Sequence, residues 1–146
     1  MDANIAKILV VDDEPDIESI INQKFRKRIR RNEMAFVFAR NGLDALQKIH
    51  KHDDIDVVLA DINMPEMVGL TLLQKRNELN RTLKAIIISA YGDMDNIRSA
   101  MNLGAHDFIT KPFDLTDLEV TLDKTLDSVC QLKEIEQLKT EKHAAL

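Results

Sequence analysis

The sequence predicts an α/β fold, in which helices cover both faces of a doubly wound sheet of five parallel strands. Short apolar runs alternate with stretches of helical period along the chain. Several of these runs are apolar on both faces, as are strands of a parallel sheet that is buried on both sides. Parallel strands joined by helices need right-handed crossovers, which give a doubly wound arrangement. The chain has 146 residues, enough for one domain with a single core.

The first two strand–helix units are expected near the N-terminus. Residues 7–11 form an apolar run that ends in charged residues, and residues 34–39 form a second β-like run. Between them, apolar residues recur at helical period over residues 16–30, which predicts one helix. Asn41 and Gly42 end the second run, and a helix of about three turns is expected to begin at Leu43.

The later units follow the same alternation. The third apolar run is interrupted only by Asp56, and the fourth is the most strongly β-branched segment of the chain. Gly104 is a suitable residue for ending the helix that follows the fourth run. The expected strands are residues 55–60, 83–90 and 107–110, and the expected helices are residues 70–79, 93–103 and a last helix from Leu115.

Composition and charge exclude several classes of protein. The formal net charge is −5, which does not favour nucleic acid as a partner. Residues 24–31 form a basic run, which we interpret as a solvated helix face with Phe25 and Ile29 turned inward; docking of an acidic partner is the alternative. The single Cys130 cannot form a disulfide within the chain. With no apolar run of about 20 residues and no signal segment, we expect a cytoplasmic protein without a membrane partner.

Polar residues end four of the predicted strands. Asp12 and Asp13 follow the first strand, and Asp61 follows the third. Ser89 lies at the end of the fourth strand, and Lys111 follows the fifth. The carboxyl ends of parallel strands meet at one edge of a sheet, where ligands of doubly wound folds bind. We therefore expect these residues to converge.

The converging groups fit phosphoryl transfer. Three clustered carboxylates repel each other unless a cation such as Mg²⁺ neutralises them. Lys111 can hold a phosphate oxygen, Ser89 can donate a hydrogen bond to another, and Asp61 is left as the nucleophile. Each residue alone is more typical of a cap or a turn, but their combination at one edge favours a site.

Four segments carry a resemblance to a known family. They are Val-Val-Asp-Asp-Glu-Pro at residues 10–15, Leu-Ala-Asp-Ile-Asn-Met-Pro at 59–65, Ile-Ser-Ala at 88–90 and Asp-Phe-Ile-Thr-Lys-Pro-Phe at 107–113. Over about residues 7–126 the chain resembles the CheY-like receiver domain of bacterial two-component response regulators. The resemblance implies a flavodoxin-like sheet with strand order 2-1-3-4-5 and a switch that a histidine kinase or phosphotransfer protein phosphorylates.

The resemblance also implies roles for single residues. Asp61 is implied to be the phosphoacceptor. Asp13 is implied to ligate Mg²⁺ directly and Asp12 through water, with the backbone carbonyl of Asn63 completing the metal site. Beryllofluoride is implied to mimic the phosphoryl group.

Three further residues complete the implied set. Ser89 and Lys111 are implied to bind phosphoryl oxygens. Ser89 and Phe108 are implied to act as the switch, with Phe108 as the aromatic that rotates. The Lys111–Pro112 peptide bond is implied to be cis.

The C-terminal part is expected to extend beyond the receiver domain. We place the receiver domain at residues 1–126 and a helical extension at residues 127–146, because a helical stripe of apolar residues continues to Leu138. Three interpretations stay open: a coiled coil that forms a homodimer, a linker to an output domain outside this chain, and a plain surface helix.

Two other functions compete with the signalling switch. A phosphatase of the haloacid dehalogenase type also forms an aspartyl phosphate with Mg²⁺, but the family has a second Asp where this chain has Asn63. A degenerate receiver would bind partners without phosphorylation, which the intact acidic residues argue against. No enzyme activity is expected beyond self-catalysed phosphorylation and dephosphorylation of Asp61.

Overall fold

The computed structural model describes residues 5–62, 83–90, 92–112 and 114–145. Five parallel strands form one sheet in the order β2-β1-β3-β4-β5. This confirms the predicted fold class and strand order. The helix predicted over residues 70–79 and Asn63 lie outside the described residues. The strands are β1 Ala6–Val11, β2 Met34–Ala39, β3 Val57–Asp61, β4 Lys84–Ala90 and β5 Asp107–Lys111.

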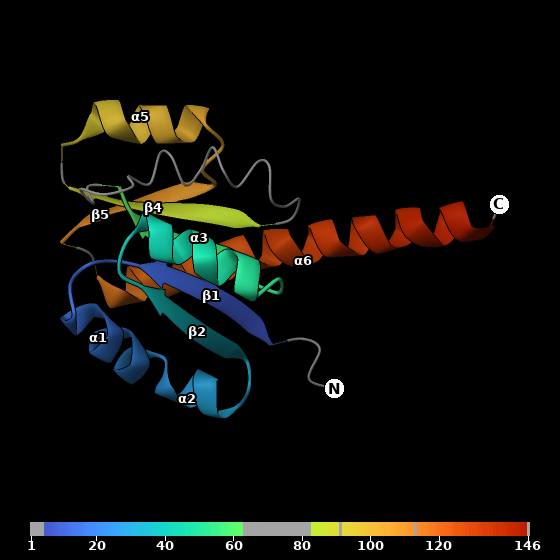
Figure 1. Ribbon diagram of the computed structural model, residues 1–146, viewed down its shortest axis with the longest axis horizontal. Helices are drawn as coiled ribbons and strands as arrows, with labels where there is room; N and C mark the ends of the chain where they lie inside the picture. Colours follow the sequence, from blue (N-terminus) through green and yellow to red (C-terminus); the bar gives the residue numbers. More distant parts are fainter. Residues whose placement is uncertain (1–4, 63–82, 91, 113, 146) are drawn as a thin grey trace.

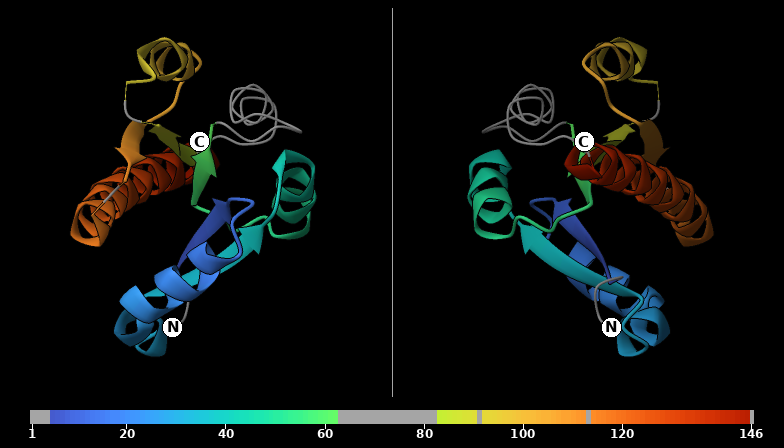
Figure 2. Two further views of the ribbon diagram at one scale, coloured as in Figure 1. Left: turned by 90° about the vertical axis from the view of Figure 1, so that its left-hand side faces the viewer. Right: turned by 90° about the vertical axis from the view of Figure 1, so that its right-hand side faces the viewer.

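Helices cover both faces of this sheet, as Figures 1 and 2 show. On one face, α1, α2 and α6 pack over a core that includes Ile8, Leu59 and Ile86. On the other face, α3 packs against β1 and β3, and α5 packs against β4. Every residue of β3 is buried, as the apolar run predicted. The described helices are α1 Asp16–Lys24, α2 Arg26–Arg30, α3 Gly42–Lys51, α5 Met94–Asn102 and α6 Leu115–Ala145.

Two predicted boundaries were wrong. The single helix predicted over residues 16–30 is divided at Phe25, whose backbone leaves the helical region at φ −101° and ψ 14°. The Phe25 ring is buried and packs on Phe36 at a centroid distance of 5.3 Å, so a tertiary contact favours the bend. The third strand begins at Val57 and not at residue 55. Asp56, just before it, uses its carboxylate to accept the N–H of Lys7 at 3.0 Å.

The basic run is partly neutralised by acidic residues of α6. Phe25 is buried and Ile29 packs against the core, as the sequence predicted. Arg28 donates to Glu119 at 3.1 Å and pairs with Asp123 at 3.0 Å. The run therefore contributes to the packing of α2 against α6.

Helix α6 continues beyond the sheet. Val129 is buried in the core, and the Lys133 ammonium contacts the carboxylate of Asp56. After this contact the helix projects away from the body (Figure 1), and Ile135 and Leu138 are 48% and 63% exposed. Within the described part of the chain, no helix is both long enough and apolar enough to cross a membrane.

Candidate functional site

The predicted residues meet at the carboxyl edge of the sheet, the edge at which the strands end. Asp12 directly follows β1, and its N–H donates to the carbonyl of Ala39 at the end of β2. Asp61 is the last residue of β3, and Lys111 is the last residue of β5. Ser89 lies in β4, in register with β5. The parallel register thus brings residues from distant parts of the chain to one place.

Three carboxylates form a compact cluster at this edge. Asp12, Asp13 and Asp61 each offer an oxygen atom, and these atoms lie within 4.8 Å of one another. Asp12 and Asp61 are buried, and Asp13 is exposed. Oδ1 of Asp12 accepts the N–H of Glu14 at 2.9 Å. Burial raises the pKa of Asp12, with the charges of Asp61 and Glu14 adding to it and the Glu14 N–H and Lys111 opposing it.

Lys111 supplies the positive charge in this cluster. Its ammonium donates to Oδ2 of Asp61 at 2.8 Å and lies 3.8 Å from Oδ2 of Asp12 and 4.0 Å from Glu14. Burial lowers the pKa of Lys111, but the hydrogen bond and charge of Asp61 outweigh burial, so the pKa is raised. Lys111 is therefore held as a cation against Asp61.

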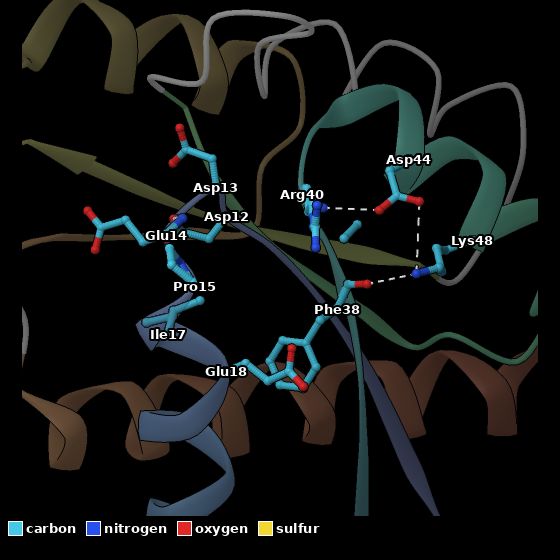
Figure 3. Close-up of a pocket in the computed structure, with 11 residues that line it drawn as sticks. Asp12, Asp13, Glu14, Pro15, Ile17, Glu18, Phe38, Arg40, Asp44 and Lys48 are labelled. Atoms are coloured by element: carbon cyan, nitrogen blue, oxygen red, sulfur yellow. Dashed lines mark hydrogen bonds and ion pairs between the residues drawn. The ribbon is translucent and has the colours of Figure 1, made fainter.

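Two of the three aspartates, Asp12 and Asp13, border a hollow of about 480 Å³ (Figure 3). Asp12, Asp13 and Glu14 line one side of it, above the start of α1. Asp44 and Lys48 of α3 line the other side, where Lys48 donates to the carbonyl of Phe38 at 2.9 Å. The hollow therefore gives access to the exposed Asp13 on the side of β2 and α3, and neither Asp61 nor Lys111 lines it.

The two predicted switch residues lie in β4 and β5. Ser89 is fully buried, and its hydroxyl contacts the carbonyl of Ala90 at 3.4 Å and Oδ2 of Asp93 at 3.5 Å. Phe108 in β5 is 38% exposed. The Lys111–Pro112 peptide bond is cis, as the resemblance implied.

Comparison with known families agrees with this geometry. A model of the response regulator receiver domain matches residues 8–123 of the chain. The chain belongs to this family. Receiver domains are signalling modules of two-component systems, phosphorylated on an aspartate beside a metal-binding acidic cluster. This membership argues against the haloacid dehalogenase alternative.

Several relatives match almost the whole receiver domain. Sporulation initiation phosphotransferase F of Bacillus subtilis (strain 168) is 34% identical over 120 residues, covering 82% of the chain and 93% of that protein. Chemotaxis protein CheY of the same organism is 32% identical over 121 residues, covering 83% and 98%. A receiver domain protein from Clostridium thermocellum has a TM-score of 0.74 at 28% identity, covering 84% and 94%.

Another relative is much longer than this chain. Regulatory protein AtoC of Escherichia coli (strain K12) is 34% identical over 136 residues, and these make up 92% of the chain but only 28% of AtoC. Receiver domains of this family thus occur both as nearly whole proteins and as parts of longer regulators.

The acidic cluster of the receiver domain fits Mg²⁺. Oδ2 of Asp12 is buried and has no hydrogen-bond partner among the described residues. A buried carboxylate oxygen without a donor is costly, and a hard divalent cation supplies the missing positive charge. Asp12, Asp13 and Asp61 provide the all-oxygen donor set that Mg²⁺ prefers. The fourth predicted ligand, the carbonyl of Asn63, lies outside the described residues.

Two residues of the receiver domain were missed by the sequence analysis. Glu14 comes within 4.0 Å of Lys111, and its place directly after the two aspartates was the available signal. Asp93 contacts the Ser89 hydroxyl from the start of α5. The two residues are four positions apart in sequence, but nothing in the sequence between β4 and α5 indicated that their side chains meet.

Proposed function

We propose that Asp61 accepts the phosphoryl group of this receiver domain from a histidine kinase or a phosphotransfer protein. The observation that carries the proposal is the Lys111 ammonium, 2.8 Å from Asp61 and inside a cluster of three carboxylates. A carboxylate oxygen of Asp61 attacks phosphorus, and the bond between phosphorus and the donor's imidazole nitrogen breaks, leaving the donor histidine.

Lys111 and Ser89 serve this transfer by holding phosphoryl oxygens. In the unphosphorylated chain Lys111 neutralises Asp61, and after transfer the same ammonium can pair with an oxygen of the phosphoryl group. Ser89 offers its hydroxyl to a second oxygen, and Phe108 follows the movement of Ser89. Mg²⁺, held by Asp12, Asp13, Asp61 and the carbonyl of Asn63, neutralises the remaining charge when bound.

We propose that α6 carries the output of the switch. Residues 127–146 act as a helical extension, either as a coiled coil between two copies or as a linker to an output domain. The exposed Ile135 and Leu138 support this, because apolar residues on a projecting helix favour a partner. The length of AtoC supports the linker form. Since the phosphoryl donor depends on a nucleotide-using kinase, the proposal implies a cytoplasmic protein.

Incubation with acetyl phosphate tests the proposed acceptor. We expect the wild type to gain one phosphoryl group by intact-protein mass spectrometry when Mg²⁺ is present, and none in EDTA. Asp61→Asn should abolish labelling, whereas Asp53→Asn, which changes an exposed aspartate far from the cluster, should not. Unlabelled wild type would support the degenerate-receiver alternative, and undiminished labelling of the Asp61 variant would exclude Asp61.

A further inference from the structure

Asp93 directly precedes α5, but its side chain does not cap the helix. An aspartate at this position usually accepts an N–H of the first helical turn, and here the side chain makes no such bond. Its backbone has φ −84° and ψ 58°, and the N–H of Met94 donates to the carbonyl of Gly92 at 2.9 Å. These values describe an inverse γ-turn centred on Asp93. The carboxylate is consequently directed away from the helix N–H groups.

The Asp93 carboxylate binds two side chains instead. Its Oδ2 contacts the hydroxyl of Ser89 at 3.5 Å, and both of its oxygens accept the side-chain amide of Asn96, at 3.1 and 3.0 Å. Asn96 is exposed to solvent, but Ser89 is fully buried. Asp93 therefore places a negative charge next to the buried hydroxyl of Ser89. In the proposed function, this same hydroxyl binds a phosphoryl oxygen on Asp61.

Ser89 cannot serve Asp93 and a phosphoryl group together. A serine hydroxyl carries one proton, so it donates to one acceptor at a time. In the present arrangement its contacts are the carbonyl of Ala90 and the carboxylate of Asp93. To donate to a phosphoryl oxygen on Asp61, Ser89 has to leave Asp93.

The connection between β4 and α5 can accommodate such a change. The N–H of Asp93 donates to the carbonyl of Ala90 at 3.2 Å, and Gly92 has φ +86°, a conformation that favours glycine. Neither this turn nor the γ-turn uses the hydrogen bonds inside α5. The start of the helix can thus rearrange while the rest of α5 stays intact.

We propose that Asp93 is a positioning residue that holds the Ser89 hydroxyl in the unphosphorylated state. When the phosphoryl group takes the hydroxyl, the Asp93 carboxylate keeps, among the described residues, only its contacts with the Asn96 amide. The competition for one proton makes the unphosphorylated state more stable and weakens the binding of the phosphoryl group. This inference rests on the proposed function, because it needs a phosphoryl group at Asp61.

Calorimetric titration of the whole chain with beryllofluoride and Mg²⁺ tests the inference. Asp93→Ala removes one of the two acceptors that compete for the Ser89 hydroxyl and leaves the carbonyl of Ala90. We therefore expect beryllofluoride to bind about twofold more tightly than to the wild type, which is the low end of the effect of one hydrogen bond. Asp93→Asn keeps a neutral acceptor and should give a smaller gain. Asp95→Ala removes an exposed acid from the same helix turn and should leave the affinity unchanged.

A second comparison separates positioning from a purely structural role. In a Ser89→Ala background the hydroxyl is gone, so Asp93→Ala should no longer tighten binding. Unchanged or weaker binding by the folded Asp93→Ala and Asp93→Asn variants would overturn the inference, as would a gain that persists without the Ser89 hydroxyl. If the wild type binds no beryllofluoride, the proposed function fails and the inference fails with it.

Discussion

Asp12 and Asp56 are buried carboxylates at opposite edges of one sheet, and their surroundings differ. Asp56 lies at the amino edge, where β3 begins, and both of its oxygens are used, one by the N–H of Lys7 and the other by Lys133. Asp12 lies at the carboxyl edge, and its Oδ2 has no hydrogen-bond partner among the described residues. Asp61, close to Asp12, already shares Lys111 with it.

The difference separates a structural carboxylate from a binding one. A buried carboxylate with all its partners stabilises the fold by joining segments that are distant in sequence. A buried oxygen without a donor reduces stability, and it persists where a ligand supplies the missing partner. Asp56 therefore joins α6 to the sheet, whereas Asp12 has a buried oxygen that is suited to binding a cation.

Removal of Asp56 should have the largest effect on stability. Asp56→Ala leaves the Lys7 N–H without its acceptor and breaks the contact with Lys133, so the free energy of unfolding should fall by about 2 kcal/mol. Asp54→Ala is the matched control, because Asp54 is an exposed partner of the Lys7 ammonium; its loss should cost less than about 0.5 kcal/mol. Urea unfolding measures both. Equal losses would contradict the structural role of Asp56.

Magnesium should stabilise the chain through the carboxyl edge alone. At a concentration ten times its Kd, Mg²⁺ should raise the free energy of unfolding by about 1.4 kcal/mol, and EDTA should reverse the gain. Asp13→Asn removes a ligand of the cluster and should abolish most of the effect. Thermal unfolding with and without Mg²⁺ checks this. An equal shift in the variant would place the cation elsewhere.

Neutralising Asp12 should stabilise the metal-free chain. Asn removes the charge that burial and the neighbouring Asp61 disfavour, while its oxygen still accepts the Glu14 N–H, so Asp12→Asn should raise the free energy of unfolding by about 1 kcal/mol. Burial raises the pKa of Asp12 above 3.8, so the folded chain binds this proton more tightly than the unfolded chain.

The contribution of Asp12 to stability should therefore fall as the pH rises from 3.8 through the raised pKa. The test measures the free energy of unfolding of the wild type and of the Asp12→Asn variant across this pH range in EDTA. The wild-type value minus the variant value isolates the contribution of Asp12. A difference that grows in favour of the wild type with rising pH would refute the sign.

Replacement of Lys133 should change the free energy of unfolding least among the four predicted effects on stability. Its side chain is half exposed, so Lys133→Met, which keeps the aliphatic stem, should cost about 0.5 to 1 kcal/mol. The same change should accelerate amide hydrogen exchange in the part of α6 that follows Lys133, because this contact holds the helix to the sheet. Unchanged exchange there would show that the core contacts of α6 suffice.

Much of the fold follows from local patterns. The second strand was predicted at the bounds that β2 has, because Phe36, Val37 and Phe38 have high β propensity and Asn41 and Gly42 follow as a break. The division of the first helix at Phe25 could not be predicted, since its apolar residues keep helical period across the bend. The contact of Phe25 with Phe36 favours that bend. Such a tertiary contact cannot be predicted from the local periodicity of apolar residues.

The site was predictable to a similar degree. That Asp12, Asp61 and Lys111 meet follows from parallel strands whose ends share one edge. The contact of Asp56 with Lys133 joins residues 77 positions apart. It could not be predicted, because the order of the strand ends does not indicate where a side chain of α6 contacts the sheet. The contact of the Asp93 side chain with Ser89 could not be predicted either, because an aspartate at the start of a helix is expected to be a cap.

Asp61 is proposed to carry the phosphoryl group, and Asp12, Asp13 and Asp56 are not. Borohydride reduction of the acetyl-phosphate-treated chain, followed by peptide mass spectrometry, marks any aspartyl phosphate at its residue. This assignment predicts reduction at Asp61 alone, and only in samples that contained Mg²⁺. Reduction at Asp12, Asp13 or Asp56 in place of Asp61, or none in any sample, would contradict it.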